Sequence, residues 1–191
     1  MRIIRHADCR PMPWKNGGGV TTEIMAWPPA AGLDAFDWRI SMAQVASGGP
    51  FSVFPGIDRT LTVLDGAMRL DAGEAPHVEL SSQSDPYAFS GDVDTTATLI
   101  DGPVLDFNVM TRRETFRHRV ERLELSNPSE IALDQGTMLA FVTSGEVSLR
   151  LRGEAVRLSE LDTVQLEAGE GVVEIAPLLP ATLLLVTIRP R

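Results

Sequence analysis

One stretch of this sequence occurs twice, and this repeat constrains the fold more than any other feature. Residues 139–154 repeat the pattern of residues 61–74, in which two apolar runs flank an Asp-Gly or Ser-Gly pair. The offset is 78 residues at the leading leucines and 79 at Gly66 and Gly145, a drift that small turn insertions leave in a duplicated unit. Asp-Gly between apolar runs is typical of a β-hairpin. The sequence therefore predicts two related β modules, each containing such a hairpin.

Much of the remaining chain has the alternation of β-strands. Trp38, Ile40 and Met42 alternate with more polar neighbours, which is the period of a strand with one apolar face. Gly and Pro turns separate many short runs and long helical periodicity is missing, so we expect an all-β sandwich or barrel in which any helix is short. The expected strands outside the second repeat are 20–26, 36–45, 51–54, 61–64, 67–70, 78–80, 87–89, 95–100, 104–111, 160–166, 172–175 and 182–188, and residues 114–123 are expected to be an extended connection.

Charge and hydropathy exclude several classes of function. The 191 residues have a formal net charge of -9 and no basic cluster interleaved with aromatics, which argues against a nucleic-acid partner. The longest apolar segment, residues 176–188, contains two prolines and is too short to cross a bilayer, and no signal-peptide pattern begins the chain. Cys9 is the single cysteine, so no intramolecular disulfide can form. We expect a cytoplasmic protein without a membrane partner.

Residues 13–24 hold the densest group of candidate ligand contacts. Lys15 is the only lysine of the chain, and three glycines follow Asn16 at positions 17–19. Successive glycines permit positive φ angles and the close approach of backbone N–H groups. A ligand-contacting loop is one interpretation, and a turn with a solvated lysine is the other. The run matches neither phosphate-loop motif, which argues against a nucleotide site.

Two predicted strands place polar side chains on one face. Asp106, Asn108 and Met110 point to the same side of their strand, and Arg39 shares a face with Ser41, because alternate residues of a strand lie on one side. A face that carries Asp and Asn either meets solvent or lines a cavity.

Three cations would form an anion-binding pocket if the fold brings them together. Lys15, Arg39 and Arg59 are these cations, and arginine pairs bidentately with carboxylate groups. The alternative for each arginine is a structural ion pair with its neighbour, Arg59 with Asp58 and Arg39 with Asp37.

The sequence gives little support for a metal site or a nucleophilic triad. The histidines are His6, His77 and His118, and none has the spacing of paired ligands on a strand, so we expect neither a metal nor another cofactor. The nucleophile-elbow motif GxSxG does not occur. Glu23 and Asp106 could serve as general acid and base only if burial raised the pKa of one of them.

Several blocks of the sequence, taken in order, resemble the HutD/Ves family. They are PWKNGGG at 13–19 with Thr22 and Glu23, WRIS at 38–41, GPFS at 49–52, FPGIDR at 54–59, and DFNVM at 106–110 with Arg112 and Arg113. The resemblance implies a bicupin fold, with two cupin-like β-barrels in one chain. Residues 1–191 would then form a single bicupin unit with approximate halves 1–113, which holds the ligand pocket, and 114–191. The histidines and glutamate with which cupins commonly hold a metal are missing from both halves.

The resemblance also implies a role in histidine utilisation, in which a member binds urocanate or N-formylglutamate and restrains the pathway. Both are carboxylates, as the cationic pocket requires. We therefore predict a metal-independent protein that binds a small anionic metabolite, with Arg59 and Arg39 clamping the carboxylate and Lys15 adding charge. The predicted ligand-binding residues are Lys15, Asn16, Thr22, Glu23, Arg39, Ser41, Arg59, Asp106, Asn108 and Met110.

Two other classes of function stay open on the sequence. An isomerase, lyase or hydrolase of a similar small acid would use Lys15 or Glu23 as its base. An interaction module with a vestigial pocket would gain no thermal stability from carboxylates. The ligand, the HutD-like or Ves-like branch, a regulatory partner and the formation of a homodimer are also left open.

Overall fold

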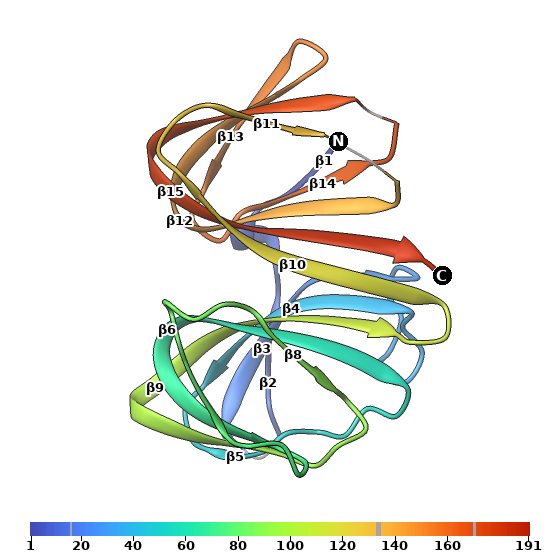
Figure 1. The fold of residues 1–191 in the computed structure, drawn as a ribbon, viewed down its shortest axis with the longest axis vertical. Coiled ribbons are helices and arrows are strands. Elements are labelled where there is room, and N and C mark those ends of the chain that lie inside the picture. Colours follow the sequence, from blue (N-terminus) through green and yellow to red (C-terminus); the bar gives the residue numbers. More distant parts are fainter. Residues whose placement is uncertain (16, 133–134, 170) are drawn as a thin grey trace. The chain divides into compact units, whose positions relative to one another are not determined.

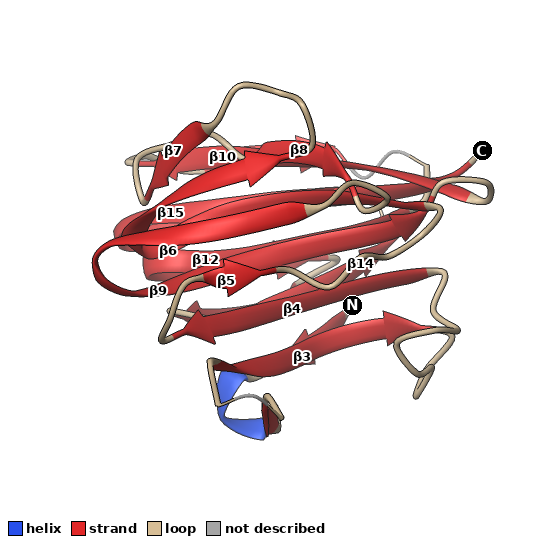
Figure 2. Cartoon of the chain, turned by 90° about the horizontal axis from the view of Figure 1, so that it is seen from below, coloured by secondary structure: helices blue, strands red, loops and turns tan. Residues whose placement is uncertain are grey.

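The chain folds almost entirely into β-strands, as Figures 1 and 2 show. The computed structural model describes residues 1–15, 17–132, 135–169 and 171–191. Within this described part, one turn of 3-10 helix, η1 (His6–Asp8), is the only helical element, and no helix has the length and apolarity needed to span a bilayer. The all-β prediction is confirmed.

The chain divides into two compact units, each with its own sheet. One unit contains Arg10–Arg117 together with Arg191, and the other contains Met1–Cys9 and His118–Pro190. We call them the 10–117 unit and the 118–190 unit. The predicted halves, 1–113 and 114–191, differ from these units at the amino terminus, where the first nine residues lie with the second half of the chain.

The 10–117 unit is built on an eight-stranded sheet with the order β2-β3-β4-β9-β6-β7. In addition, β5 pairs with β9 and β8 pairs with β6. All pairings are antiparallel. The strands are β2 (Pro11–Pro13), β3 (Gly19–Trp27), β4 (Trp38–Val45), β5 (Gly49–Pro50), β6 (Ile57–Ala72), β7 (Val78–Ser81), β8 (Tyr87–Ser90) and β9 (Thr95–Arg112).

The 118–190 unit is built on a seven-stranded sheet with the order β1-β14-β12-β15-β10. Here β11 pairs with β15 and β13 pairs with β12. The strands are β1 (Arg2–Ile4), β10 (Phe116–Leu125), β11 (Ser129–Ala132), β12 (Thr137–Leu151), β13 (Glu154–Ser159), β14 (Thr163–Glu167) and β15 (Val172–Pro190).

A salt bridge and a strand pairing fix the amino terminus in the 118–190 unit. Strand β1 pairs with β14, with Ile3 opposite Val164. Arg5 Nη1 donates to Asp162 Oδ2 at 2.7 Å, and the His6 N–H donates to Asp162 Oδ1 at 3.0 Å. These contacts join residues more than 150 positions apart in sequence, which local pattern cannot predict.

The two repeated segments are bent strands, so the prediction of a hairpin at Asp65-Gly66 is wrong. Strand β6 runs through Gly66 and pairs with β9 on both sides of it, with register shifts between Val63 and Ala67. Strand β12 runs through Gly145 in the same way, with register shifts against β15. The two glycines have φ angles of 79° and 80°, which are typical of bulges that bend a sheet. The repeat is therefore structural, but its glycines bend long strands.

Replacing Gly66 with Ala should cost more stability than the same change at Gly56. Both glycines have positive φ, 79° and 73°, so both variants strain the backbone by about 1 kcal/mol. A Cβ at Gly66 would also lie 2.6 Å from the Pro103 carbonyl oxygen, whereas nothing lies within 4 Å at Gly56. We expect Gly66→Ala to lose about 3 kcal/mol in chemical denaturation. Equal losses in the two variants would contradict this account of the bend.

Other expected strands are joined or missing. Segments 95–100 and 104–111 form one strand, β9, and segments 172–175 and 182–188 form one strand, β15. Residues 51–54 are irregular, and their backbone N–H groups bond individually to Thr95 and Gly91 carbonyls. Prolines at both ends of this segment remove ladder donors, which explains why no strand forms there.

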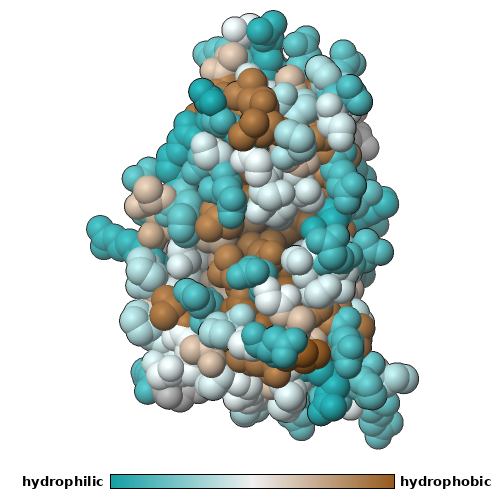
Figure 3. Space-filling model, turned by 90° about the vertical axis from the view of Figure 1, so that its left-hand side faces the viewer, coloured by the Kyte–Doolittle hydropathy of each residue, from teal (hydrophilic) through white to brown (hydrophobic). Residues whose placement is uncertain are grey.

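Each unit has its own apolar core. The 118–190 core contains Leu125, Ala140, Val142, Val147, Leu149, Leu151, Leu158, Val164, Leu166, Val173, Ile175, Ala181 and Leu183. The main core of the 10–117 unit contains Leu61, Val63, Met68, Leu70, Leu80, Ala97 and Val104. We call the side of the eight-stranded sheet that carries Leu61 and Val63 its inner face. Hydrophobic side chains on the surface lie in separate patches among hydrophilic ones on the face shown in Figure 3.

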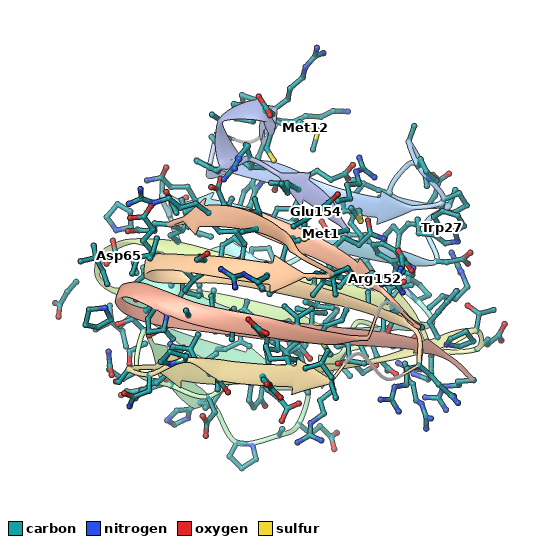
Figure 4. The ribbon with its side chains drawn as sticks, turned by 90° about the horizontal axis from the view of Figure 1, so that it is seen from above. Met1, Met12, Trp27, Asp65, Arg152 and Glu154 are labelled. Atoms are coloured by element: carbon teal, nitrogen blue, oxygen red, sulfur yellow. The ribbon has the colours of Figure 1, made fainter. Side chains whose placement is uncertain are left out.

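Strand β2 closes one edge of the eight-stranded sheet. It consists of Pro11, Met12 and Pro13, and it pairs with β3. Met12 lies on the outside, 45% exposed (Figure 4). Because proline has no N–H, two of the three residues cannot donate to a further strand, and the sheet ends here.

Candidate functional site

The strand register brings six polar residues together on the inner face of the eight-stranded sheet. Ser41 pairs with Glu23 on one side and Asn108 on the other, so these three form one row across β3, β4 and β9. In the next row, Met110 pairs with both Arg39 and Arg59. We call the following residues the polar cluster: Glu23, Arg39, Ser41, Arg59, Asp106 and Asn108.

Arg39 is held by an ion pair at the accessible side of the cluster. Its Nε donates to Glu23 Oε2 at 2.7 Å, and its Nη1 donates to Ser41 Oγ at 3.3 Å. The Arg39 side chain is buried, whereas that of Glu23 is 32% exposed. The register shift between Glu23 and Met25 is a β-bulge, a feature that redirects side chains. The predicted alternative pair of Arg39 with Asp37 does not form, since Asp37 instead pairs with Arg112 among the described residues.

Arg59 is linked to Asp106 through an amide. Arg59 Nη2 donates to Asn108 Oδ1 at 2.9 Å, and Asn108 Nδ2 donates to Asp106 Oδ1 at 2.5 Å. All three residues are buried, Asp106 to 1% exposure. Asp58, the neighbour proposed as the structural partner of Arg59, instead accepts from Arg113 Nε at 2.7 Å. The guanidinium of Arg59 therefore points into the cluster.

Three phenylalanine rings surround the Arg59 guanidinium. Its central carbon lies 5.2 Å from the ring centroid of Phe51, 5.7 Å from that of Phe54 and 5.0 Å from that of Phe89. Such distances are those of cation–π contacts. The sequence analysis included Phe51 and Phe54 in blocks of family resemblance but did not assign them to the site, and Phe89 comes from a strand remote in sequence. Nothing in their local pattern distinguishes them from ordinary core residues.

One N–H of this buried guanidinium has no acceptor. Arg59 is only 7% exposed, and its Nε is buried without a hydrogen-bond partner. Leaving a buried donor unsatisfied costs about 1–3 kcal/mol. An arginine in this state offers a strong donor to any acceptor that reaches it.

Burial shifts the pKa values of both ends of this linkage. Desolvation raises the pKa of Asp106 to about 7, although the charge of Arg59 and the hydrogen bond from Asn108 act in the opposite direction. Desolvation also lowers the pKa of Arg59 to about 10; Asp106 opposes this shift and the like charge of Arg39 adds to it. Near neutral pH, Arg59 is therefore charged while Asp106 exists in both forms.

The other four predicted site residues, Lys15, Asn16, Thr22 and Met110, are not members of the polar cluster. Lys15 is exposed in the turn between β2 and β3, and it is not part of the polar cluster. Asn16 lies outside the described residues. Thr22 pairs with Met42, so its side chain is on the face opposite Glu23, because neighbours in a strand point to opposite sides. Met110 is buried and packs with Phe36 and Ile57. It lies between Arg39 and Arg59 in the sheet, because it pairs with both.

The glycine-rich turn is anchored by a tryptophan. Trp14 Nε1 donates to Thr21 Oγ1 at 2.7 Å, and the Trp14 N–H donates to the Gly19 carbonyl at 2.9 Å. A Cβ at Gly19 would lie 2.6 Å from the Gln44 carbonyl oxygen and 3.0 Å from the Trp14 ring. At this position, glycine is required by packing within the protein.

Neither the acidic residues nor an open groove provides a second site of similar chemistry. Among the described residues, no group of three or more His, Cys, Asp or Glu is arranged to hold a metal ion. An open groove lies between segments 46–49 and 96–99. Its lining has no ionisable side chain, so it offers no charge to hold an anion.

Sequence comparisons connect the chain to named relatives. Residues 6–181 match the model of a protein family described as HutD. A protein of Pseudomonas putida, described as an uncharacterized 21.2 kDa protein in the hutC 3' region, is 36% identical over 172 residues, which are 89% of this chain and 88% of that protein. Protein Ves of Citrobacter koseri is 38% identical over 121 residues, which are 61% of this chain and 62% of Ves.

Solved structures share the whole fold. HutD from Pseudomonas fluorescens SBW25 has a TM-score of 0.84 at 31% identity, covering 100% of this chain and 98% of that chain. At 7% identity, oxalate decarboxylase from Lactobacillus farciminis has a TM-score of 0.70, covering 97% of this chain and 85% of that chain. A cupin 2 conserved barrel domain protein from Leptotrichia buccalis has a TM-score of 0.61 at 10% identity, covering 97% and 100%. Together with the two sheets, these likenesses confirm the predicted cupin-like architecture.

Proposed function

Because the chain belongs to the HutD family, we propose that it binds a small carboxylate metabolite at the polar cluster and acts in the regulation of histidine utilisation. The relative from Pseudomonas putida is encoded in the hutC 3' region by its description, and HutD itself is a structural relative over the whole chain. These likenesses support the pathway, while the polar cluster supports the chemistry.

The observation that carries the proposal is the buried Nε–H of Arg59 without an acceptor. A carboxylate has two acceptor oxygens and matches the guanidinium fork. The rings of Phe51, Phe54 and Phe89 around this group lower the local dielectric, which strengthens a charge-assisted bond. A ligand carboxylate would satisfy the donor and neutralise the cation in one step.

Arg39 has a different role in this proposal. Its Nε is already bonded to Glu23, so Arg59 is the primary anchor and Arg39 supports the row beside it. Glu23 is partly exposed, and its carboxylate can accept an N–H from the part of a ligand that lies outside the cluster. Urocanate has one carboxylate and N-formylglutamate has two, and each also has such an N–H.

Carboxylates that bind the cluster should raise the melting temperature of the protein. A ligand that binds only the folded state at 100 times its Kd adds about 2.7 kcal/mol, which corresponds to about 5–10 °C for a chain of this size. The measurement is a thermal unfolding series with formate, urocanate and N-formylglutamate. Propionamide serves as the uncharged control. Sodium chloride, at the ionic strength of the carboxylate solutions, serves as the salt control.

The same experiment separates binding from the other functions. If the melting temperature with every carboxylate equals that with sodium chloride, carboxylate binding is excluded. If urocanate is consumed during incubation, as followed by its ultraviolet absorbance, the protein is an enzyme. Stable urocanate together with a raised melting temperature supports a binding protein.

A further inference from the structure

The inner face around the polar cluster carries few charges, and they can be counted. Asp106 is faced from the surrounding strands by the following ionisable side chains: Glu23 from β3, Arg39 from β4, Arg59 from β6 and Tyr87 from β8. Glu23 and Arg39 form an ion pair of 2.7 Å, so their charges cancel. The net charge of the cluster is therefore decided by Arg59 and Asp106.

Asp106 and Arg59 do not form a direct ion pair among the described residues. The Asn108 side chain lies between them, accepting from Arg59 and donating to Asp106. An amide links the two groups by hydrogen bonds but carries no charge of its own. Asp106 is 1% exposed, so its carboxylate is shielded from bulk solvent, and burial raises its pKa to about 7. The neutral form of Asp106 is therefore populated near pH 7.

Resting on the proposed function, we infer that the cluster takes a monocarboxylate, and that it does so with Asp106 in the neutral form. With Asp106 neutral, the cluster carries one uncompensated positive charge, on Arg59, which one ligand carboxylate neutralises. With Asp106 ionised, the cluster is already neutral, and a carboxylate would add an unpaired negative charge to a buried site. Such a charge is costly in a low-dielectric environment.

The same count disfavours a second carboxylate on the ligand, and so favours urocanate over the dicarboxylate N-formylglutamate. Arg39 is bonded to Glu23, so the cluster has no second free cation. Three phenylalanine rings surround Arg59, and they cannot hydrogen-bond an anion. A dicarboxylate must therefore leave its second charge unpaired or keep it in solvent. The site is expected to discriminate by charge between ligands of the same shape.

A matched ligand series tests the discrimination. Crotonate and fumarate have the same trans four-carbon frame, but crotonate has one carboxylate and fumarate has two. Monomethyl fumarate is larger than fumarate but carries only one charge. Calorimetric titration of the full chain at pH 7 should show fumarate binding at least about 10-fold more weakly than crotonate. Monomethyl fumarate should bind better than fumarate, because it carries one charge fewer. Since it is also the larger molecule, this result would exclude size as the cause of the weaker binding of fumarate.

Proton uptake tests the role of Asp106. Titration of crotonate at pH 8 in phosphate and in Tris, which differ in ionisation heat, should show uptake of close to one proton. Affinity should fall about tenfold between pH 6 and pH 8. Asp106→Asn should lose both the uptake and the pH dependence. Asp71→Asn, at a half-exposed residue of β6, is the control that should keep them.

The outcomes separate this inference from the proposed function. Fumarate binding as tightly as crotonate overturns the monocarboxylate class. Crotonate binding without proton uptake, or unchanged pH dependence in Asp106→Asn, overturns the role of Asp106. If formate, crotonate and fumarate all fail to bind, the proposed carboxylate function itself is wrong.

Discussion

Replacing Arg59 with Met should abolish carboxylate binding while leaving a folded protein. Arg59 supplies the one buried N–H without an acceptor in the polar cluster, and it is the only cluster cation that is not bonded to a carboxylate among the described residues. Losing a buried charged partner costs about 2–5 kcal/mol of binding free energy. We expect at least about a 100-fold loss of affinity by calorimetry.

The stability of this variant provides an independent check. Removing the charge relieves its desolvation, which offsets part of the cost of about 1–3 kcal/mol of leaving the buried Asn108 Oδ1 without its donor. Met also suits the surrounding rings of Phe51, Phe54 and Phe89. Chemical denaturation should therefore place Arg59→Met within about 2 kcal/mol of the wild type. Such a result would mean that Arg59 serves binding rather than folding.

Two further variants make the test sharp. Arg59→Lys keeps the charge but loses the planar fork, so an intermediate loss of at least about 10-fold is expected. Arg69→Gln changes an exposed arginine of the same strand, β6, and should retain wild-type affinity. If Arg59→Met binds the ligand as tightly as Arg69→Gln, the carboxylate site lies elsewhere.

The second large effect is a loss of stability with rising pH that depends on Asp106. Its pKa is about 7 in the folded protein, against an ordinary value of 3.8. Between these values the folded state holds a proton that the unfolded state has released, so the contribution of Asp106 to stability is largest below pH 4 and falls as the pH rises to 7. Above pH 7 the contribution is constant. Since each pKa unit corresponds to about 1.4 kcal/mol, the fall is about 4 kcal/mol.

The variant Asp106→Asn should remove this fall. Its amide has no proton to lose, and its oxygen can still accept from Asn108. Free energies of unfolding at pH 4.5, 6 and 8 should decline in the wild type relative to the variant, and the variant should be the more stable protein at pH 8. Parallel curves for the two proteins would show that Asp106 is ionised throughout this range. Asp71→Asn should follow the wild-type curve, because Asp71 is half exposed.

Sequence patterns predicted the strands and faces of the site well. Alternation placed Arg39 with Ser41, and Asp106 with Asn108, on shared faces, and the register agrees. Thr22 was included among the predicted ligand contacts, but the register places it on the face opposite Glu23. A period of two residues is a local property of extended backbone, which explains this success.

The same patterns could not distinguish a hairpin from a bend. Asp65-Gly66 has the composition of a hairpin turn, but β6 continues past it because β9 supplies a partner on both sides. A partner about 40 positions away in sequence therefore decides the structure of this dipeptide. The closing of the amino terminus onto β14 was missed for the same reason.

The sequence by itself determined the class of the protein: strands of period two, a repeated bent segment, and blocks that resemble one family. Only the tertiary structure decided the chemistry of the site. It left Lys15 exposed, joined Arg39 to Glu23, and enclosed Arg59 among three rings that come from separate segments. Charge and hydrogen bonding at a site depend on burial and on distances between residues remote in sequence, and a sequence pattern specifies neither.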